Sequence, residues 1–221
     1  MTTRVLLIRH GATVLTAEDR FAGSTDVELS DEGRNQAKRL AERLEPESLA
    51  AVYASPMVRT VDTAAILAAP HRLTVIREPR LVEIAHGRWE GMTRRQVETD
   101  CAEEYAAWEA DPFTFAPEGG ESGLSVMARA LPALREIVLA HPNRTAAVVS
   151  HKATIRLVLC SVLGIDARGY RDRLDLSPAC LNVLDFRDPV RARLMLYNDV
   201  SHYAARPRES SAQLSKWWDV R

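Results

Sequence analysis

The chain has 221 residues, of which 46% are hydrophobic and 27% are charged. This composition is typical of a globular protein that buries a sizeable core, and it excludes a disordered chain. The formal net charge is -1, so no basic field favours nucleic acid or an anionic membrane surface. The length suits one large domain or two small ones.

The cysteines and the N-terminal segment exclude further classes of protein. Three cysteines, Cys101, Cys160 and Cys180, lie far apart and show neither a CxxC pattern nor a Cys/His ligand spacing. They therefore indicate neither a disulfide framework nor a zinc site, and they favour a reduced, cytoplasmic compartment. The apolar run at residues 5–8 is too short for a signal peptide or a membrane span. A soluble, cytoplasmic protein is the expectation.

The first part of the chain alternates predicted strands and helices. Strands are predicted at three apolar runs, residues 5–8, 49–54 and 73–76. Ser30 is a predicted cap for a helix with apolar residues at helical spacing, which ends by Pro46. Ser55 and Pro56 predict a second helix, with serine as its cap and proline at its first position.

The middle of the chain, residues 86–123, has no strand pattern. Thr93 and Gln96 resemble a capping box and predict a helix that runs to about Trp108. A loop rich in proline and glycine follows. We interpret this stretch as an inserted helical cap, in which Trp89 and Trp108 either pack the cap or line a pocket.

The last part returns to the alternating pattern. A helix begins at Ser122 or Ser125, and another over residues 153–163 is closed by Gly164. Strands are predicted at residues 145–149, 179–186 and 191–197. The whole pattern predicts an α/β fold, a three-layer α/β/α sandwich with a mostly parallel central sheet and a small inserted helical cap.

Five polar residues follow predicted strands along the chain. Arg9 and His10 follow the first strand, and Arg59 lies in the first turn of the helix after the second. Glu83 follows the third strand, and His151 follows the strand at 145–149. In open α/β sheets, ligands bind beyond the carboxyl ends of the strands. We therefore expect these five side chains to converge, although each alone would more often be a turn, cap or surface residue.

These residue types suit the transfer of a phosphoryl group. Two arginines offer planar donors that match phosphate oxygens, and a neutral histidine is a competent nucleophile toward phosphorus. A second, protonated histidine would donate to the phosphate, and a carboxyl group would protonate the leaving oxygen. Hydrolysis by a bound metal fits less well, because two arginines repel a cation and no HExxH spacing is present. We therefore expect neither a metal nor another cofactor.

Several segments resemble those of one known family, in the family's order over residues 4–165. They are Arg-His-Gly at 9–11, the loop and helix start at 21–33, the arginine segment at 53–64, the acid-bearing segment at 81–91, Gly-Gly-Glu-Ser at 119–122 and Val-Val-Ser-His at 148–151. The chain thus resembles the histidine phosphatase superfamily, also called the phosphoglycerate mutase-like family. The resemblance implies a single domain over residues 1–221, with the cap inserted at about 86–123.

The resemblance also implies roles for the five converging residues. His10 would be the phosphorylated nucleophile, and Glu83 would be the proton donor. Arg9, Arg59 and His151 would form the phosphate pocket.

Further phosphate-binding positions carry some departures from the family pattern. Thr16, Gly23 and Lys152 are expected at such positions. Thr16 stands where the family often has asparagine, and Ala22 where a glutamine or threonine is common. Lys152-Ala153 replaces the usual glycine pair, and Lys152 faces either the pocket or solvent.

The expected reaction is hydrolysis of a phosphomonoester, with a small acidic phosphorylated metabolite as substrate. The Gly-Arg-Trp-Glu-Gly form at residues 87–91 resembles the phosphatase branch of the family. A mutase needs a deep lid that excludes water, and the insertion here is shorter than in family mutases. Phosphoglycerate mutase-type transfer and a catalytically silent binding relative are the alternatives. As partners we expect neither nucleic acid nor a membrane, and a homodimer is left open.

Overall fold

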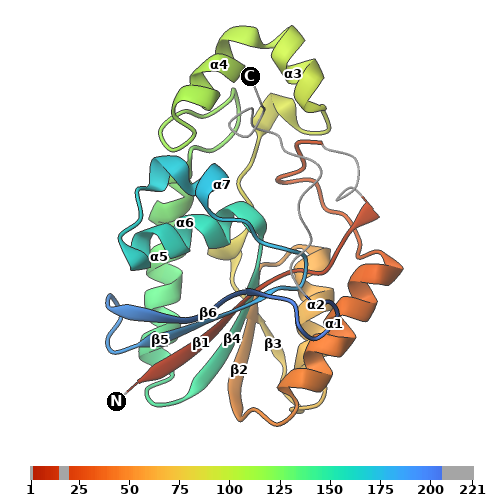
Figure 1. The fold of residues 1–221 in the computed structure, drawn as a ribbon, viewed down its shortest axis with the longest axis vertical. Coiled ribbons are helices and arrows are strands. Elements are labelled where there is room, and N and C mark those ends of the chain that lie inside the picture. The colour runs from red at the N-terminus through yellow and green to blue at the C-terminus, as the bar shows by residue number, and fades with distance from the viewer. Residues whose placement is uncertain (1, 15–19, 206–221) are drawn as a thin grey trace.

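The computed structural model describes residues 2–14 and 20–205. Its centre is a mixed sheet of six strands in the order β3-β2-β4-β1-β5-β6 (Figure 1). The strands are β1 (Thr3–Arg9), β2 (Leu49–Ala54), β3 (Val75–Arg77), β4 (Thr145–Ser150), β5 (Leu181–Phe186) and β6 (Ala192–Asp199). The first four are mutually parallel, and β5 and β6 run antiparallel at one edge. The mostly parallel sheet of the sequence prediction is confirmed.

Helices cover both faces of this sheet. Those of the described residues are α1 (Asp31–Leu44), α2 (Val58–Ala68), α3 (Arg94–Asp100), α4 (Ala102–Ala110), α5 (Gly123–Ala140), α6 (Lys152–Leu163) and α7 (Tyr170–Arg173), with 3-10 turns at Pro79–Leu81, Gly87–Trp89 and Ala167–Gly169. On one face, Leu40 of α1 and Leu67 of α2 pack in a core with β2. On the other, Leu134 of α5 and Leu159 of α6 pack against β1. The apolar strands are therefore buried on both sides, which explains their continuous hydrophobic runs.

Most of the local signals in the sequence act as predicted. Ser30 caps α1 by accepting a hydrogen bond from the Gly33 amide. Thr93 and Gln96 form the capping box of α3, and the Ser122 side chain caps α5. Gly164 ends α6 with a φ of 68°, a left-handed conformation that glycine adopts without strain.

Two local predictions were wrong. The helix predicted to begin at Pro56 begins two residues later, at Val58, and its N-cap Met57 makes no side-chain capping bond. The Ser55 hydroxyl instead forms a hydrogen bond with the side chain of His151, the residue that follows β4. The single helix predicted from Thr93 to about Trp108 is divided into α3 and α4, because Cys101 has a non-helical backbone with φ of -134° and ψ of 42°.

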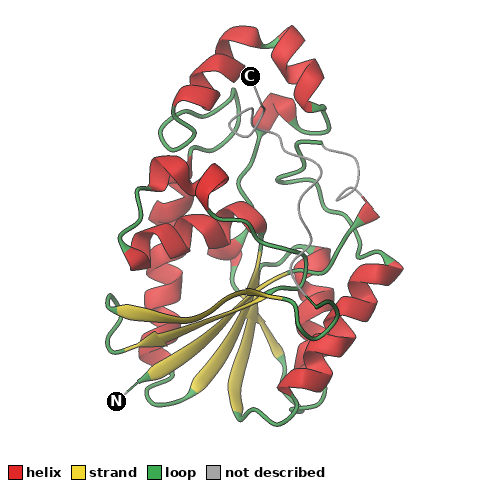
Figure 2. Cartoon of the chain, in the orientation of Figure 1, coloured by secondary structure: helices red, strands yellow, loops and turns green. Residues whose placement is uncertain are grey.

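Helices α3 and α4 stand apart from the sheet, beyond the carboxyl ends of its strands (Figure 2). They enclose an aromatic cluster that includes Phe21, Trp89, Tyr105 and Trp108. Trp89 and Trp108 are both buried there, so they pack these helices. No helix in the described ranges is long and apolar enough to cross a membrane.

Candidate active site

The two histidines of the predicted site are brought together by the pairing of β1 with β4. These strands are parallel neighbours, and Arg9 at the end of β1 lies in register with Ser150 at the end of β4. His10 and His151 are the next residues of the two strands, and their ring centroids lie 5.2 Å apart in an edge-to-face arrangement. The predicted convergence at the carboxyl ends of the strands is therefore present in the fold for these two residues.

One ring nitrogen of His10 forms a hydrogen bond with the backbone, and the other takes no part in that bond. Its Nδ1 lies 2.7 Å from the carbonyl oxygen of Gly11, so Nδ1 carries the proton and donates it. The lone pair then resides on Nε2. Burial, followed by the charges of Arg9 and Arg59, holds the pKa of His10 well below its usual value of 6.5. His10 is consequently a neutral imidazole at neutral pH.

Gly11 is required by the close packing of this turn. A Cβ atom at residue 11 would lie 2.4 Å from the carbonyl oxygen of Gly33 at the start of α1. The Gly11 amide donates to the Thr63 hydroxyl of α2, at 3.2 Å. These contacts fix the backbone carbonyl that orients the His10 ring.

His151 is fully buried, and both of its nitrogens are engaged. Arg59 Nε donates to His151 Nδ1 at 3.2 Å, and His151 Nε2 lies 2.8 Å from the Ser55 hydroxyl. A nitrogen that accepts from an arginine carries no proton, so the ring is neutral and Nε2 is the donor. Burial and then the Arg59 charge hold the pKa of His151 well below 6.5. The sequence reasoning expected a protonated His151, and in the structure this arginine opposes that state.

Arg59 joins His151 to a loop that precedes α1. Its two terminal nitrogens donate to the carbonyl oxygens of Thr25, at 2.8 Å, and Gly23, at 3.0 Å. Gly23 itself packs so closely on Ile84 that a Cβ would lie 1.9 Å from the Ile84 carbonyl oxygen. Gly23 therefore reaches the site through its backbone.

The loop is in turn held by a carboxylate that sequence reasoning missed. Glu90 accepts hydrogen bonds from the amides of Ser24 and His86, both at 2.9 Å, and from the Thr25 hydroxyl at 3.0 Å. Glu90 thus fixes the carbonyl groups that Arg59 uses. The sequence signal was its place in the Gly-Arg-Trp-Glu-Gly segment, which the family resemblance had singled out without giving this residue a role.

Arg9 is incompletely satisfied by the protein. One terminal nitrogen donates to the Leu176 carbonyl oxygen at 2.6 Å. Its Nε is buried and has no hydrogen-bond partner within the part of the chain that the structure describes. A buried N–H without a partner costs free energy, and an anion beside it would supply the missing acceptor. Burial lowers the pKa of Arg9, but an arginine remains charged at any physiological pH.

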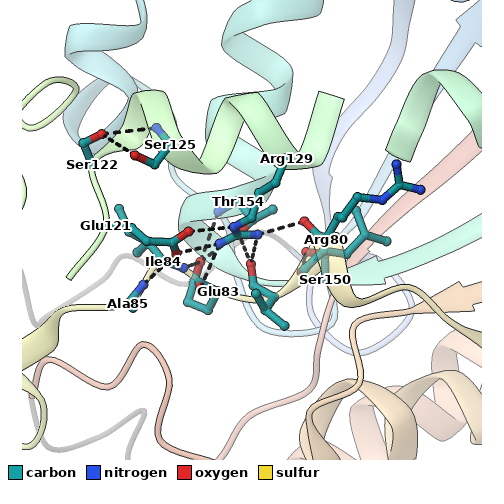
Figure 3. Close-up of polar contacts among 12 residues, drawn as sticks. Arg80, Glu83, Ile84, Ala85, Glu121, Ser122, Ser125, Arg129, Ser150 and Thr154 are labelled. Carbon is teal, nitrogen blue, oxygen red and sulfur yellow. Dashed lines mark hydrogen bonds and ion pairs between the residues drawn. The ribbon is translucent and has the colours of Figure 1, made fainter. Parts of the chain in front are cut away.

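Glu83 lies at the N-terminus of α6, one turn from His151. Its carboxylate accepts hydrogen bonds from the amides of Ala153 and Thr154, both at 3.1 Å. Figure 3 shows Glu83 beside Thr154. Because α6 begins at the residue after His151, the same short segment positions both groups.

The segment that carries Glu83 is clamped from α5 by Arg129 (Figure 3). Arg129 donates to the carbonyl oxygens of Arg80 and Val82, both at 2.8 Å, and of Glu83, at 3.1 Å. It also forms a bidentate ion pair with Glu121, with both distances 2.8 Å. Glu121 accepts from the Ala85 amide at 3.1 Å. Neither Arg129 nor Glu121 was a candidate from sequence, although Glu121 belongs to the Gly-Gly-Glu-Ser segment.

Lys152 forms an ion pair with Asp175. Its Nζ lies 3.1 Å from Asp175 Oδ1, and Arg156 Nη2 lies 3.2 Å from the same oxygen. Burial, and then the neighbouring Arg156 and Arg9, lower the pKa of Lys152 to about 8. Arg156 and Asp175 were not singled out from sequence, because nothing local marks their pairing.

Two sequence predictions remain, one for Thr16 and one for metal binding. Thr16 lies outside the described residues. Residues 2–14 and 20–205 contain no group of three or more histidine, cysteine or acidic side chains placed to hold a metal ion.

Comparison with known proteins gives consistent results. A sequence model of the histidine phosphatase superfamily (branch 1) matches residues 5–200. The chain is 38% identical over 163 residues to phosphoserine phosphatase 1 of Hydrogenobacter thermophilus, which covers 74% of this chain and 77% of that protein. It is 34% identical over 168 residues to a glucosyl-3-phosphoglycerate phosphatase of Mycobacterium tuberculosis, and the matched region covers 72% of this chain and 75% of that protein.

Solved structures show the same fold. YhfR of Bacillus stearothermophilus superposes with a TM-score of 0.84 at 29% identity, over 90% of this chain and 98% of that one. A mycobacterial glucosyl-3-phosphoglycerate phosphatase superposes with a TM-score of 0.81 at 30% identity, over 90% of this chain and 99% of that one.

Proposed function

The chain belongs to the histidine phosphatase superfamily (branch 1), and from that premise we propose that His10 carries the transferred phosphoryl group. The resemblance seen in the sequence is confirmed, and three of the proteins reported above are named as phosphatases, one of phosphoserine and two of glucosyl-3-phosphoglycerate. The chain is an enzyme that acts as a phosphatase on a phosphorylated metabolite. This favours hydrolysis over mutase-type transfer and over a silent binding role.

The neutral state of His10, with its single ring proton on Nδ1, is the observation that carries the proposal. Because Nδ1 donates to the Gly11 carbonyl at 2.7 Å, the lone pair of Nε2 is available for attack. The pKa of His10 lies well below 6.5 through burial and the two arginines, so protonation does not block this lone pair at neutral pH. A nucleophile must hold its lone pair free at the working pH, and this histidine does.

Arg9 and Arg59 are proposed to stabilise the charge on the migrating phosphoryl group. Phosphoryl transfer depends chiefly on positioning and on positive charge around the equatorial oxygens. The Nε of Arg9, which has no hydrogen-bond partner among the described residues, supports this role, since phosphate would complete its hydrogen bonding. Arg59 has further N–H groups beyond the three that bind His151, Thr25 and Gly23. His151 is proposed to contact the phosphate through a rearrangement of its bond with Arg59 or Ser55.

The reaction then proceeds in two steps. In the first, His10 Nε2 forms a bond to phosphorus while the bond to the leaving oxygen breaks, and Glu83 gives that oxygen a proton. In the second, water attacks the phosphorus as the nitrogen–phosphorus bond breaks, and the Glu83 carboxylate accepts a proton from the water. Inorganic phosphate and neutral His10 are the products of this second step.

The finer parts of the proposal concern organisation and partners. We take residues 1–221 as one domain with a cap inserted at about 86–123. The substrate is proposed to be a small acidic phosphorylated metabolite, and Gly23 and Lys152 to contribute to its binding. Metal independence, a cytoplasmic location and the absence of a nucleic-acid partner stay predictions, and a homodimer stays open.

Trapping the intermediate tests the proposal. The protein is mixed briefly with a radiolabelled phosphomonoester, denatured and digested, and the labelled peptide is identified. We expect an acid-labile, base-stable label on His10, which His10→Ala abolishes together with hydrolysis of p-nitrophenyl phosphate. His71→Ala is the matched control and should label normally. Label on a serine, an aspartate or another histidine would overturn the assignment.

A further inference from the structure

Beside the phosphate pocket lies a group of three residues that take no part in the two chemical steps proposed above. Lys152, Arg156 and Asp175, called here the Asp175 cluster, meet at one carboxylate oxygen. The cluster adjoins the pocket along the chain, because Lys152 follows His151. It also adjoins the pocket in space, because Arg9 binds the carbonyl oxygen of Leu176, the neighbour of Asp175.

The cluster contains more positive charge than its own carboxylate neutralises. Lys152 and Arg156 share Asp175 as their ion-pair partner. Arg156 has 10% of its side chain exposed, and its Nε is buried without a hydrogen-bond partner among the described residues. A second anion would supply both the missing charge and the missing acceptor.

The backbone around the cluster is fixed in advance. Tyr197 of β6 donates a hydrogen bond to the Asp175 carbonyl oxygen. The Ser177 amide donates to Asn198 Oδ1 at 2.7 Å, and Leu176 is fully buried. The segment that carries Asp175 is thus held in place before a ligand binds, which lowers the entropic cost of binding.

The cluster is nevertheless accessible to a small molecule. The Asp175 side chain is 43% exposed and that of Lys152 is 28% exposed. The Asp175 carboxylate can therefore turn toward solvent while an incoming carboxylate takes its place on Lys152 and Arg156. By contrast, Arg88 of the cap is already paired with Glu104 and Glu118.

We infer that the Asp175 cluster binds a carboxylate group of the substrate, which makes the substrate a phosphomonoester that also carries a carboxylate close to the phosphate. The cations already hold a carboxylate of the protein itself, so their arrangement suits that group. Arg9 binds the carbonyl oxygen of Leu176, the residue next to Asp175. The phosphate on Arg9 and the carboxylate on the Asp175 cluster would therefore lie close together. This inference rests on the proposed phosphatase function and assigns its substrate class.

A pair of substrates that differ by one carboxylate tests the inference. O-phosphoserine and O-phosphoethanolamine have the same leaving oxygen, and only the first has a carboxylate. We expect the kcat/KM of the protein to be higher for O-phosphoserine by about tenfold or more, since hydrogen bonds between charged groups are strong. Lys152→Met should reduce this preference to near unity, mainly through KM, and Lys152→Arg should restore part of it. Lys38→Met, on the exposed face of α1, is the matched control and should leave both rates unchanged.

A variant with the opposite expected effect guards against a loss of folding. Asp175→Asn removes the competing carboxylate, so KM for O-phosphoserine should fall while the fold is monitored by thermal unfolding. An equal loss on both substrates in Lys152→Met would show that Lys152 binds the transferred phosphate and would overturn the inference, as would an unchanged preference. Labelling of His10 separates the two proposals. If His10 is labelled but the protein shows no preference for the carboxylate, only the carboxylate-binding role of the Asp175 cluster is refuted. If His10 is not labelled, the proposed phosphatase mechanism is refuted.

Discussion

Replacement of Arg129 by methionine should impair proton transfer by Glu83 more than it impairs the rest of the reaction. Methionine keeps much of the aliphatic volume but removes every donor. The three carbonyl groups of Arg80, Val82 and Glu83 would lose their partner, and Glu121 would lose its cation. The segment that carries Glu83 would then be free to shift away from α5.

The cost in stability can be estimated from the burial of the ion pair. The side chains of Arg129 and Glu121 are 18% and 26% exposed. Removal of one partner of a largely buried pair costs about 3 kcal/mol, at the lower end of the usual range because water reaches part of this pair. The matched control is Arg34→Met, which breaks the more exposed pair of Arg34 with Asp62 between α1 and α2 and should cost roughly 0–1 kcal/mol. Urea denaturation measures both.

The effect on activity should depend on the leaving group. An alkyl phosphate needs a proton on its leaving oxygen, whereas the phenolate of p-nitrophenyl phosphate leaves with little help. Displacement of an acid by about 1 Å can cost up to about 10²-fold in rate. We therefore expect Arg129→Met to slow an alkyl phosphate by about 10-fold to 10²-fold more than the aryl ester, and Arg129→Lys to give an intermediate result. Equal slowing of both substrates in a folded variant would refute a positioning role for Arg129.

Three further outcomes are expected. Glu83→Gln should slow alkyl phosphates severely and spare p-nitrophenyl phosphate in single-turnover measurements, and equal slowing of both would make Glu83 a structural residue. Arg59→Ala should lower kcat by about 10²–10³-fold with an unchanged circular dichroism spectrum, whereas a loss below about tenfold would place it outside the pocket. The pKa values of His10 and His151 in the folded protein lie well below 6.5, so below about pH 6.5 the unfolded chain binds protons that the folded protein does not. The free energy of unfolding, measured with urea, should therefore decrease as the pH falls from 7 to 5, and His10→Asn should weaken that decrease; a constant value would contradict the burial of two neutral histidines.

The sequence by itself determined the order of the elements and their type. The apolar run of β1, the cap at Ser30, the capping box at Thr93 and the left-handed end at Gly164 are local signals, and each acts within a few residues. Their alternation was enough to predict a mostly parallel sheet. Because such a sheet aligns the carboxyl ends of its strands, the sequence also predicted that His10 and His151 would meet.

Tertiary structure alone decided which partners these residues have. Ser55 looked like a helix cap by its place before Pro56, yet its hydroxyl contacts His151, 96 positions away. Arg129 reaches the carbonyl oxygens of a segment 46 to 49 positions earlier. No local pattern specifies such contacts, because a polar side chain takes the partner that packing brings within hydrogen-bond distance.

The same reason explains the charge state of the site. From the sequence, His151 was expected to be protonated and Lys152 was left between pocket and solvent. Burial and the positions of Arg59 and Asp175 decided both cases, since the pKa of a group depends on its solvation and on charges that the chain brings near it. The sequence thus predicted which residues would meet at the candidate site, while their protonation and their hydrogen-bond partners were fixed only when β1, β4, α5 and α6 packed together.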